Sequence, residues 1–223
     1  MVSESLQLKT FIITIKDNEK SVAAAERCAN SIKQFNPIFH GAFTPADDPV
    51  GELEKLGIPI QGFKKGERYS VLEPTISAFL SHRSLWVKSV EMNEEMQILE
   101  HDAVATGYVP HVIKYDKCIS LGKPSYGKFN NPSFIGNGPL VSKPYFPGAH
   151  AYRLKPAGAK ILLEAAKKYA CTTDVMLDIR RFAFLEEYYP WPFEAKDSFT
   201  TLQKLEGCKA KHNFGSKYEI LSS

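Results

Sequence analysis

The residues with the clearest chemical potential lie in the segment Gln97–Ala103, which reads Gln-Ile-Leu-Glu-His-Asp-Ala. A short apolar run ends abruptly there in two acids, Glu100 and Asp102, that flank His101. In an open α/β sheet, ligands bind beyond the carboxyl ends of the strands. If Met96–Leu99 is a strand, both carboxylates lie at such an edge. Paired carboxylates can hold a divalent cation against a substrate diphosphate, so the pattern predicts a metal-dependent active site.

The three residues of this motif have different expected roles. Mg²⁺ and Mn²⁺ prefer oxygen ligands and often retain water. We therefore expect Asp102 to bind the metal directly. Glu100 is expected to act as the second acid, on the metal, on metal-bound water or on a ribose hydroxyl. His101 is interpreted either as a hydrogen-bonded structural histidine or as an auxiliary contact to the donor.

Other candidate site residues lie in three later segments of the chain. Arg83 follows His82 on a predicted helix and is a candidate for a phosphate contact. His150 lies among small residues that let a ligand approach closely. We expect it either to contact the sugar or the metal, or to form a hydrogen bond within the core. Asp174 and Asp178 are four residues apart and are candidates for the general base that accepts a proton from an acceptor hydroxyl. Asp174 is preferred because it lies nearer the junction of loop and helix.

The elements that must position these residues alternate between strand and helix patterns. Short apolar runs predict strands at Lys9–Ile15, Pro37–Phe43, Ile58–Ile60, Met96–Leu99, Lys117–Leu121 and Ala149–Leu154. Helical spacing of apolar residues predicts helices at Glu19–Phe35, Pro49–Leu56, Pro74–Met92, Pro156–Tyr169 and Thr173–Glu187. Gly62–Val71 is expected to be a loop and Tyr188–Ala195 to be extended. This order favours an α/β fold with a mostly parallel, Rossmann-like sheet flanked by helices.

The segment Gly122–Gly148 differs from the rest of the chain in its density of Gly, Pro, Asn, Ser and aromatic residues. Long irregular loops within compact domains are usually functional or disordered. The aromatic residues argue against simple disorder, so we interpret residues 122–148 as a lid or acceptor-binding loop, with a structural excursion as the alternative. We find no linker or internal repeat, and we expect residues 1–223 to form one domain.

Composition argues against a nucleic-acid-binding protein, a membrane-spanning protein and a secreted protein. The chain of 223 residues is 43% hydrophobic and 24% charged, with a net charge of +3 that is too small to indicate a nucleic-acid partner. No apolar run approaches the roughly 20 residues that span a bilayer. The polar amino terminus does not resemble a signal peptide. The four cysteines form no CxxC pair, which indicates reduced thiols and a cytoplasmic location.

Four motifs, in order, resemble glycosyltransferase family 25, which contains lipooligosaccharide galactosyltransferases and collagen β-galactosyltransferases. They are Ser81–Trp86, Ile98–Ala103, Gly148–Tyr152 and Gly158–Leu163. Asp174 falls where the family usually has an acid, and Ser198–Thr201 resembles its closing motif. The resemblance implies a GT-A type fold, Mn²⁺ or Mg²⁺, and a UDP-galactose or UDP-glucose donor. It also implies inversion at the anomeric carbon, which needs one base and no covalent intermediate.

Two of the chain's departures from the family pattern bear on its activity. The family's acidic triplet Glu-Asp-Asp is Glu100-His101-Asp102 here, and the loop after the first predicted strand lacks the family's arginine. These departures favour an alternative, a catalytically weak protein that binds a sugar nucleotide or a glycan. A nucleotidyltransferase is less favoured because neither GxGxxG nor GxxxxGK[ST] is present. The acceptors consistent with a transferase are a glycan, a lipid-linked glycan such as the lipopolysaccharide core, or a protein hydroxyl.

Overall fold

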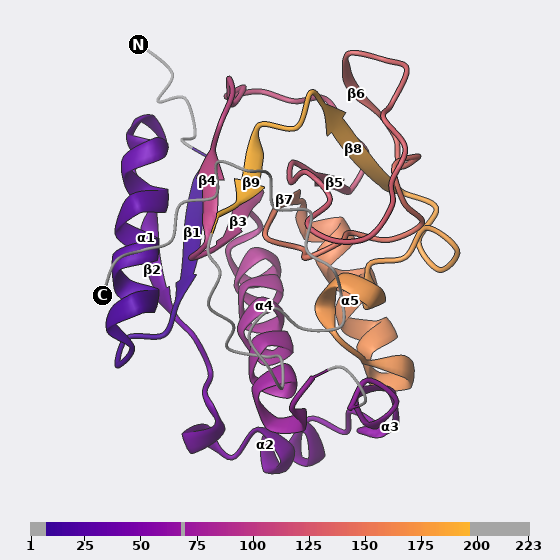
Figure 1. Ribbon diagram of the computed structural model, residues 1–223. Coiled ribbons are helices and arrows are strands. Elements are labelled where there is room, and N and C mark those ends of the chain that lie inside the picture. Colours follow the sequence, from indigo (N-terminus) through magenta and orange to yellow (C-terminus); the bar gives the residue numbers. More distant parts are fainter. Residues whose placement is uncertain (1–7, 68–69, 197–223) are drawn as a thin grey trace.

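The computed structural model describes residues 8–67 and 70–196 and has an α/β architecture (Figure 1). A seven-stranded sheet has the order β2-β1-β3-β7-β5-β8-β6 and is flanked by helices. Its strands are β1 (Lys9–Thr14), β2 (Ile38–Gly41), β3 (Met96–Glu100), β5 (Cys118–Ser120), β6 (Gly136–Pro139), β7 (Ala151–Leu154) and β8 (Leu185–Tyr189). A separate two-stranded sheet pairs β4 (Ala103–Ala105) with β9 (Phe193–Ala195). The motif expected at Ser198–Thr201 lies outside the described residues.

The large sheet is mixed, so the expected mostly parallel arrangement is not confirmed. β1 runs parallel to β2 and β3, and β5 runs parallel to β8. β7 is antiparallel to both of its neighbours, β3 and β5, and β6 is antiparallel to β8. Parallel neighbours need a long crossover connection. Residues 122–148 make no such crossover, because they leave the end of β5 and return to the start of β7 at the same edge of the sheet.

Helices cover both faces of the sheet. They are α1 (Glu19–Ser31), η1 (Lys33–Phe35), η2 (Pro45–Asp47), α2 (Pro49–Lys55), α3 (Gln61–Lys64), α4 (Leu72–Met92), α5 (Pro156–Tyr169) and α6 (Thr173–Met176). The long α4 and α5 pack on one face, and α1 packs on the other. None of the described helices is both long enough and apolar enough to cross a membrane.

Four predicted helices are confirmed with small changes of boundary. The predicted helix Glu19–Phe35 is divided into α1 and the 3₁₀ turn η1, and the helices predicted at Pro49–Leu56, Pro74–Met92 and Pro156–Tyr169 correspond to α2, α4 and α5. The strand predicted at Ile58–Ile60 is wrong, because these residues connect α2 to α3 without pairing. Part of α3 also occupies the predicted loop Gly62–Val71.

The helix predicted over Thr173–Glu187 is also wrong. Helix α6 ends at Met176, and β8 occupies Leu185–Tyr189. The Asp178 carboxylate accepts a hydrogen bond from the backbone N–H of Arg180 at 2.8 Å. Such local side-chain bonds offer the backbone an alternative to a helix. Asp178 also forms a β-bridge with Tyr145, and the chain then turns, with the backbone N–H groups of Arg181 and Phe182 donating to the Asp178 carbonyl at 2.9 Å.

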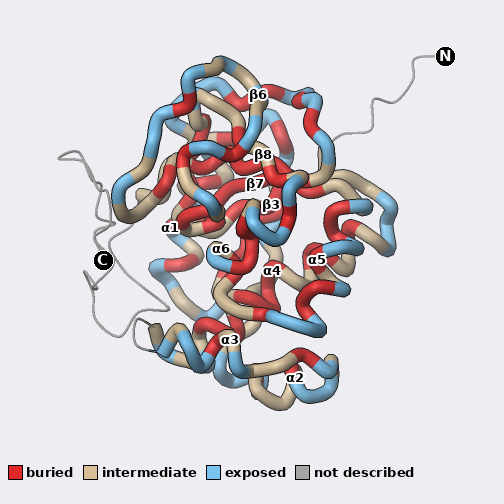
Figure 2. The backbone as a smooth tube through the Cα atoms, turned by 90° about the vertical axis from the view of Figure 1, so that its right-hand side faces the viewer, coloured by how far each residue is buried: buried red, intermediate tan, exposed pale blue. Residues whose placement is uncertain are grey.

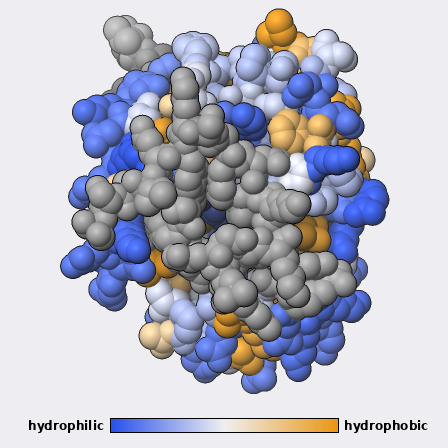
Figure 3. All heavy atoms as spheres, viewed as in Figure 1, coloured by the Kyte–Doolittle hydropathy of each residue, from blue (hydrophilic) through white to orange (hydrophobic). Residues whose placement is uncertain are grey.

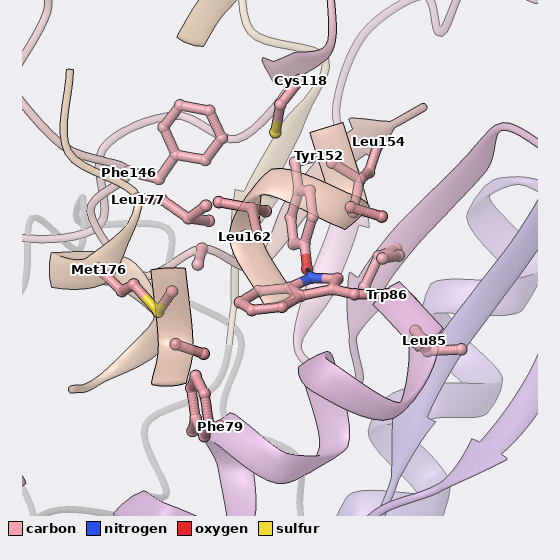
Figure 4. Packing of buried hydrophobic residues seen from close by; sticks show 14 of the residues in the cluster. Phe79, Leu85, Trp86, Cys118, Phe146, Tyr152, Leu154, Leu162, Met176 and Leu177 are labelled. Atoms are coloured by element: carbon pink, nitrogen blue, oxygen red, sulfur yellow. Dashed lines mark hydrogen bonds between the residues drawn. The ribbon is translucent and has the colours of Figure 1, made fainter. Parts of the chain in front are cut away.

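The core lies on both sides of the sheet, and alternation along each strand assigns side chains to the two faces. In β1, Phe11 and Ile13 pack toward α4, whereas Ile12 packs toward α1. Trp86 of α4 and Tyr152 of β7 point toward each other within the α4 side (Figure 4), and the Trp86 indole N–H donates to the Tyr152 hydroxyl at 2.9 Å. The central strands are buried, whereas the loop around β6 is largely exposed or half-exposed (Figure 2).

Candidate active site at the carboxyl edge of the sheet

Strand directions bring the candidate residues to one edge of the sheet, which we call the carboxyl edge. β1, β3, β5 and β8 all run in the same direction, and β7 runs against them. The carboxyl ends of these four strands therefore meet the amino end of β7. The Glu100 N–H, at the end of β3, donates to the carbonyl of His150, which precedes β7, at 2.9 Å. This is the sheet edge at which ligands bind in open α/β folds.

Alternation along β3 directs Glu100 toward α4. One carboxylate oxygen of Glu100 lies 3.0 Å from His82 Nε2, and His82 Nδ1 lies 3.0 Å from the Tyr152 hydroxyl. Burial lowers the pKa of His82 to about 3, so this imidazole is neutral. One assignment of protons satisfies all contacts: Trp86 donates to Tyr152, Tyr152 to His82 Nδ1, and His82 Nε2–H to Glu100. A buried polar chain thus fixes the Glu100 carboxylate.

His101 extends toward the opposite face of the sheet. Its Nδ1 lies 3.1 Å from the hydroxyl oxygen of Ser21, near the start of α1. That hydroxyl also accepts the backbone N–H of Ile15 at 2.9 Å, just after β1. The contact ties the turn after β3 to the connection between β1 and α1. Of the two interpretations of His101, this geometry favours the structural one.

Asp102 has a buried oxygen that no described residue satisfies. Its Oδ1 has no hydrogen-bond partner among the described residues. Burial and the nearby Glu100 charge raise the pKa of Asp102 to about 6. Burial also raises the pKa of Glu100 to about 7, although 28% of that side chain remains exposed. Two like charges in a partly desolvated edge are unfavourable unless a cation neutralises them.

His150 lies just before β7, within electrostatic reach of Asp102, and is 2% exposed. Neither ring nitrogen has a partner of hydrogen-bond geometry among the described residues. Burial lowers the pKa of His150, and the Asp102 charge and the Phe193 backbone oppose that shift. Buried polar groups normally have partners. His150 and Asp102 thus place buried polar atoms without partners among the described residues at the same part of the carboxyl edge.

Asp174 is brought to the same site from α6. Its charge raises the pKa of Glu100 and opposes the lowering of the pKa of His82, so it lies within electrostatic reach of both. Asp174 Oδ1 accepts the backbone N–H of Val175 at 2.8 Å, and Oδ2 accepts the hydroxyl hydrogen of Tyr126. A half-buried carboxylate held in this way beside the acids can act as a general base.

Two other predicted site residues are not joined to this cluster. Asp178 is buried and binds the Arg180 side chain through both carboxylate oxygens, and this ion pair lowers its pKa. Arg83 is half-buried on α4, and its pKa is lowered by burial alone, with no effect from the acids of the site. The structure thus brings Asp174 together with Glu100, and it gives Asp178 a structural ion pair.

Sequence reasoning gave the lysine and tyrosines of the loop no individual role at the site. Lys143 Nζ donates to the backbone carbonyl of Tyr126 at 2.6 Å. The same ammonium lies 4.9 Å from the ring centre of Tyr126 and 5.5 Å from that of Tyr145. These contacts hold the loop beside Asp174. The only signal in the sequence was the aromatic content of residues 122–148, because no local pattern reveals a contact with Asp174, 48 residues from Tyr126.

The acid pair offers few donor atoms to a metal ion. Within residues 8–67 and 70–196, no group of three or more His, Cys, Asp or Glu side chains could hold a metal ion. Mg²⁺, however, is usually bound by one or two carboxylates together with substrate phosphates and water. The unsatisfied oxygen of Asp102, next to Glu100, fits that mode of binding.

No known protein family matches this sequence, and no similar curated protein was found. The geometry of the carboxyl edge, together with the motifs in the sequence, is therefore the basis for assigning a function.

Replacing His82 with phenylalanine is expected to lower the free energy of unfolding by about 2 kcal/mol, because two buried hydrogen bonds are lost while the ring volume is retained. Urea denaturation followed by circular dichroism measures this change. His40→Phe is the matched control, since it removes one bond, from His40 Nε2 to the Ser84 hydroxyl at 2.8 Å. Equal losses in the two variants would contradict a special role for the polar chain.

Replacing Gly122 with alanine is expected to destabilise the protein by about 1–3 kcal/mol, because the core around it is overpacked. The added Cβ would lie 2.5 Å from Nε2 of the buried His150 ring. Thermal melting measures the effect. Gly107→Ala is the control, because its Cβ would have no neighbour closer than 3.9 Å. If both variants melt at the same temperature, His150 is not confined as described.

Proposed function

We propose that this chain is a metal-dependent, inverting glycosyltransferase with a GT-A type fold, acting in the cytoplasm. It would move galactose or glucose from a UDP-sugar to a hydroxyl of a glycan or protein. One observation carries the proposal: the buried, unsatisfied oxygen of Asp102 beside Glu100 at the carboxyl edge. The order of the four family-like motifs supports it, since three of them contribute His82, the acid pair and His150 to this edge.

Asp102 and Glu100 are the residues that would hold Mn²⁺ or Mg²⁺. A bound cation of this kind supplies Lewis-acid neutralisation of a leaving diphosphate. The hydrogen bond from His82 Nε2 keeps Glu100 oriented and favours its ionised form. His150 offers an imidazole beside Asp102 for a donor contact.

The chain's own contribution to the displacement is assigned to Asp174. Its carboxylate would take the proton of the acceptor hydroxyl as that oxygen bonds to the anomeric carbon. The bond from the anomeric carbon to the diphosphate oxygen breaks in the same step, which inverts the configuration. Tyr126 would orient the base through its hydrogen bond to Asp174 Oδ2.

The direct test is a donor screen. UDP release is measured from UDP-galactose and UDP-glucose, with Mn²⁺ or Mg²⁺ and with EDTA. We expect metal-dependent release from at least one donor, even without an acceptor. A melting temperature raised by a nucleoside triphosphate with Mn²⁺, and not by a UDP-sugar, would instead indicate a nucleotidyltransferase.

A second candidate is a protein that binds a sugar nucleotide or glycan without turnover. The histidine at position 101 favours it, because it leaves two acids where the family usually has three and its Nδ1 contacts Ser21. Such a protein would melt at a higher temperature with UDP-sugar and Mn²⁺ but would release no UDP with any acceptor in a broad set.

A further inference from the structure

A buried carboxylate organises the loop at the far end of the carboxyl edge. The Glu187 side chain, on β8, is 0% exposed. Its Oε1 accepts the backbone N–H groups of Val141 and Ser142 at 2.6 and 2.7 Å. Its Oε2 accepts the indole N–H of Trp191 at 3.0 Å. The Glu187 carboxylate thus holds both the loop of residues 122–148 and Trp191 through hydrogen bonds. Hydrogen bonds to an ionised group are stronger than those between neutral groups.

Trp191 is a half-exposed aromatic residue held in one orientation. Phe129 and Tyr189 pack against it edge-to-face, at 5.5 and 4.9 Å between ring centres. Trp86, by contrast, is fully buried in the core. On the face shown in Figure 3, the described residues are mostly hydrophilic and the apolar ones lie in separate patches. A half-exposed tryptophan whose indole N–H is bound by a buried carboxylate presents its aromatic surface in a fixed orientation.

The position of Trp191 in the sheet relates it to the acid pair. It follows the carboxyl end of β8, which belongs to the same edge as the end of β3. Three strand spacings separate β3 from β8 in the sheet order, or about 14 Å along the edge. The loop residues beside Asp174, Tyr126 and Lys143, belong to the same loop that Glu187 anchors.

We propose that Trp191, positioned by Glu187, forms a sugar-binding subsite for an oligosaccharide acceptor. The inference rests on the proposed function, because only a glycosyltransferase would use a glycan bound here as its acceptor. An indole face is electronegative and attracts the weakly positive C–H groups of a sugar ring. The ends of β3 and β8 are further apart than one sugar ring is wide, so the ligand we infer is an oligosaccharide whose reacting hydroxyl would lie at Asp174. Glu187 is completely buried, so it acts as a positioning residue and does not touch the ligand.

The test uses the full chain with Mn²⁺ and UDP on an array of defined oligosaccharides. The glycan bound best by the wild type is then titrated against variants. Trp191→Ala is expected to weaken this binding at least about tenfold. Tyr108→Ala, at an aromatic that is 79% exposed, is the control and should bind as the wild type does. UDP release without acceptor should be equal in all variants, because the subsite does not contact the donor.

Glu187→Gln tests the positioning role. Glutamine keeps one carbonyl oxygen but presents an amide NH₂, so it cannot accept both from the loop and from Trp191. We expect weaker glycan binding with unchanged UDP release without acceptor. Trp191→Phe, which keeps an aromatic ring and loses the N–H, should give a smaller loss than Trp191→Ala.

Several outcomes would overturn the subsite: no array glycan binds the wild type, Trp191→Ala binds as tightly as the wild type, or Trp191→Ala and Tyr108→Ala weaken binding equally. A protein that binds a glycan through Trp191 yet releases no UDP would support the subsite and overturn the proposed transferase activity.

Discussion

Replacing Asp102 with asparagine is expected to reduce metal-dependent UDP release by about 1000-fold, which corresponds to about 4 kcal/mol of transition-state stabilisation. The same substitution is expected to raise the melting temperature of the metal-free protein. At pH 8 the Asp102 carboxylate is charged although burial and Glu100 raise its pKa to about 6, so its charge disfavours the folded state. Asparagine removes that charge. UDP release and thermal melting in EDTA measure the two effects.

The opposite signs of these two effects distinguish a metal ligand from a structural acid. Mn²⁺ should raise the melting temperature of the wild type and not that of Asp102→Asn. Asp116→Asn is the matched control, since Asp116 is an exposed residue that pairs with its neighbour Lys117. We expect it to change neither quantity. Retention of Mn²⁺-dependent UDP release in Asp102→Asn would place the metal elsewhere.

Replacing Asp174 with asparagine is expected to lower transfer to an acceptor by about 10²–10⁴-fold, because the proposed general base is lost. Asparagine can still accept one of the two hydrogen bonds, from Val175 or Tyr126, so the loop should stay in place. The thermal shift caused by UDP-sugar with Mn²⁺ should therefore be unchanged. Transfer is measured with the oligosaccharide that most increases UDP release.

Asp178→Asn provides the matched control for the base. It weakens the ion pair with Arg180 and should lower the free energy of unfolding by about 1 kcal/mol. Turnover per folded molecule should stay within about threefold of the wild type. If Asp178→Asn abolishes transfer while Asp174→Asn spares it, the assignment of the base must be reversed.

The local elements were largely predictable because their signals are local. Apolar runs and helical spacing identified β1, β3, α4 and α5, and with them the position of Glu100 at a strand end. The direction of β7 was not predictable, because it depends on where residues 122–148 return to the sheet. The helix predicted from Thr173 failed because a tertiary β-bridge and the bonds between Asp178 and Arg180 outweigh helical spacing.

The site was predictable in its acids and in His150, but not in the contacts that position them. The spacing of Glu100 and Asp102 placed them at an edge, but nothing in the sequence shows that His101 contacts Ser21, 80 residues away. The roles of Tyr126 and Glu187 also arise from contacts between distant segments. Side chains alternate between the two faces of a sheet along β3, which explains why Glu100 points toward α4 and His101 points toward the opposite face.

The chain of hydrogen bonds from Trp86 through Tyr152 and His82 to Glu100 links the buried core to the acids at the carboxyl edge. A lineage that exchanged Trp86 for a purely apolar residue would leave Tyr152 without its donor, and the disturbance would reach Glu100 through one imidazole. Substitutions at these four positions are therefore expected to arise together.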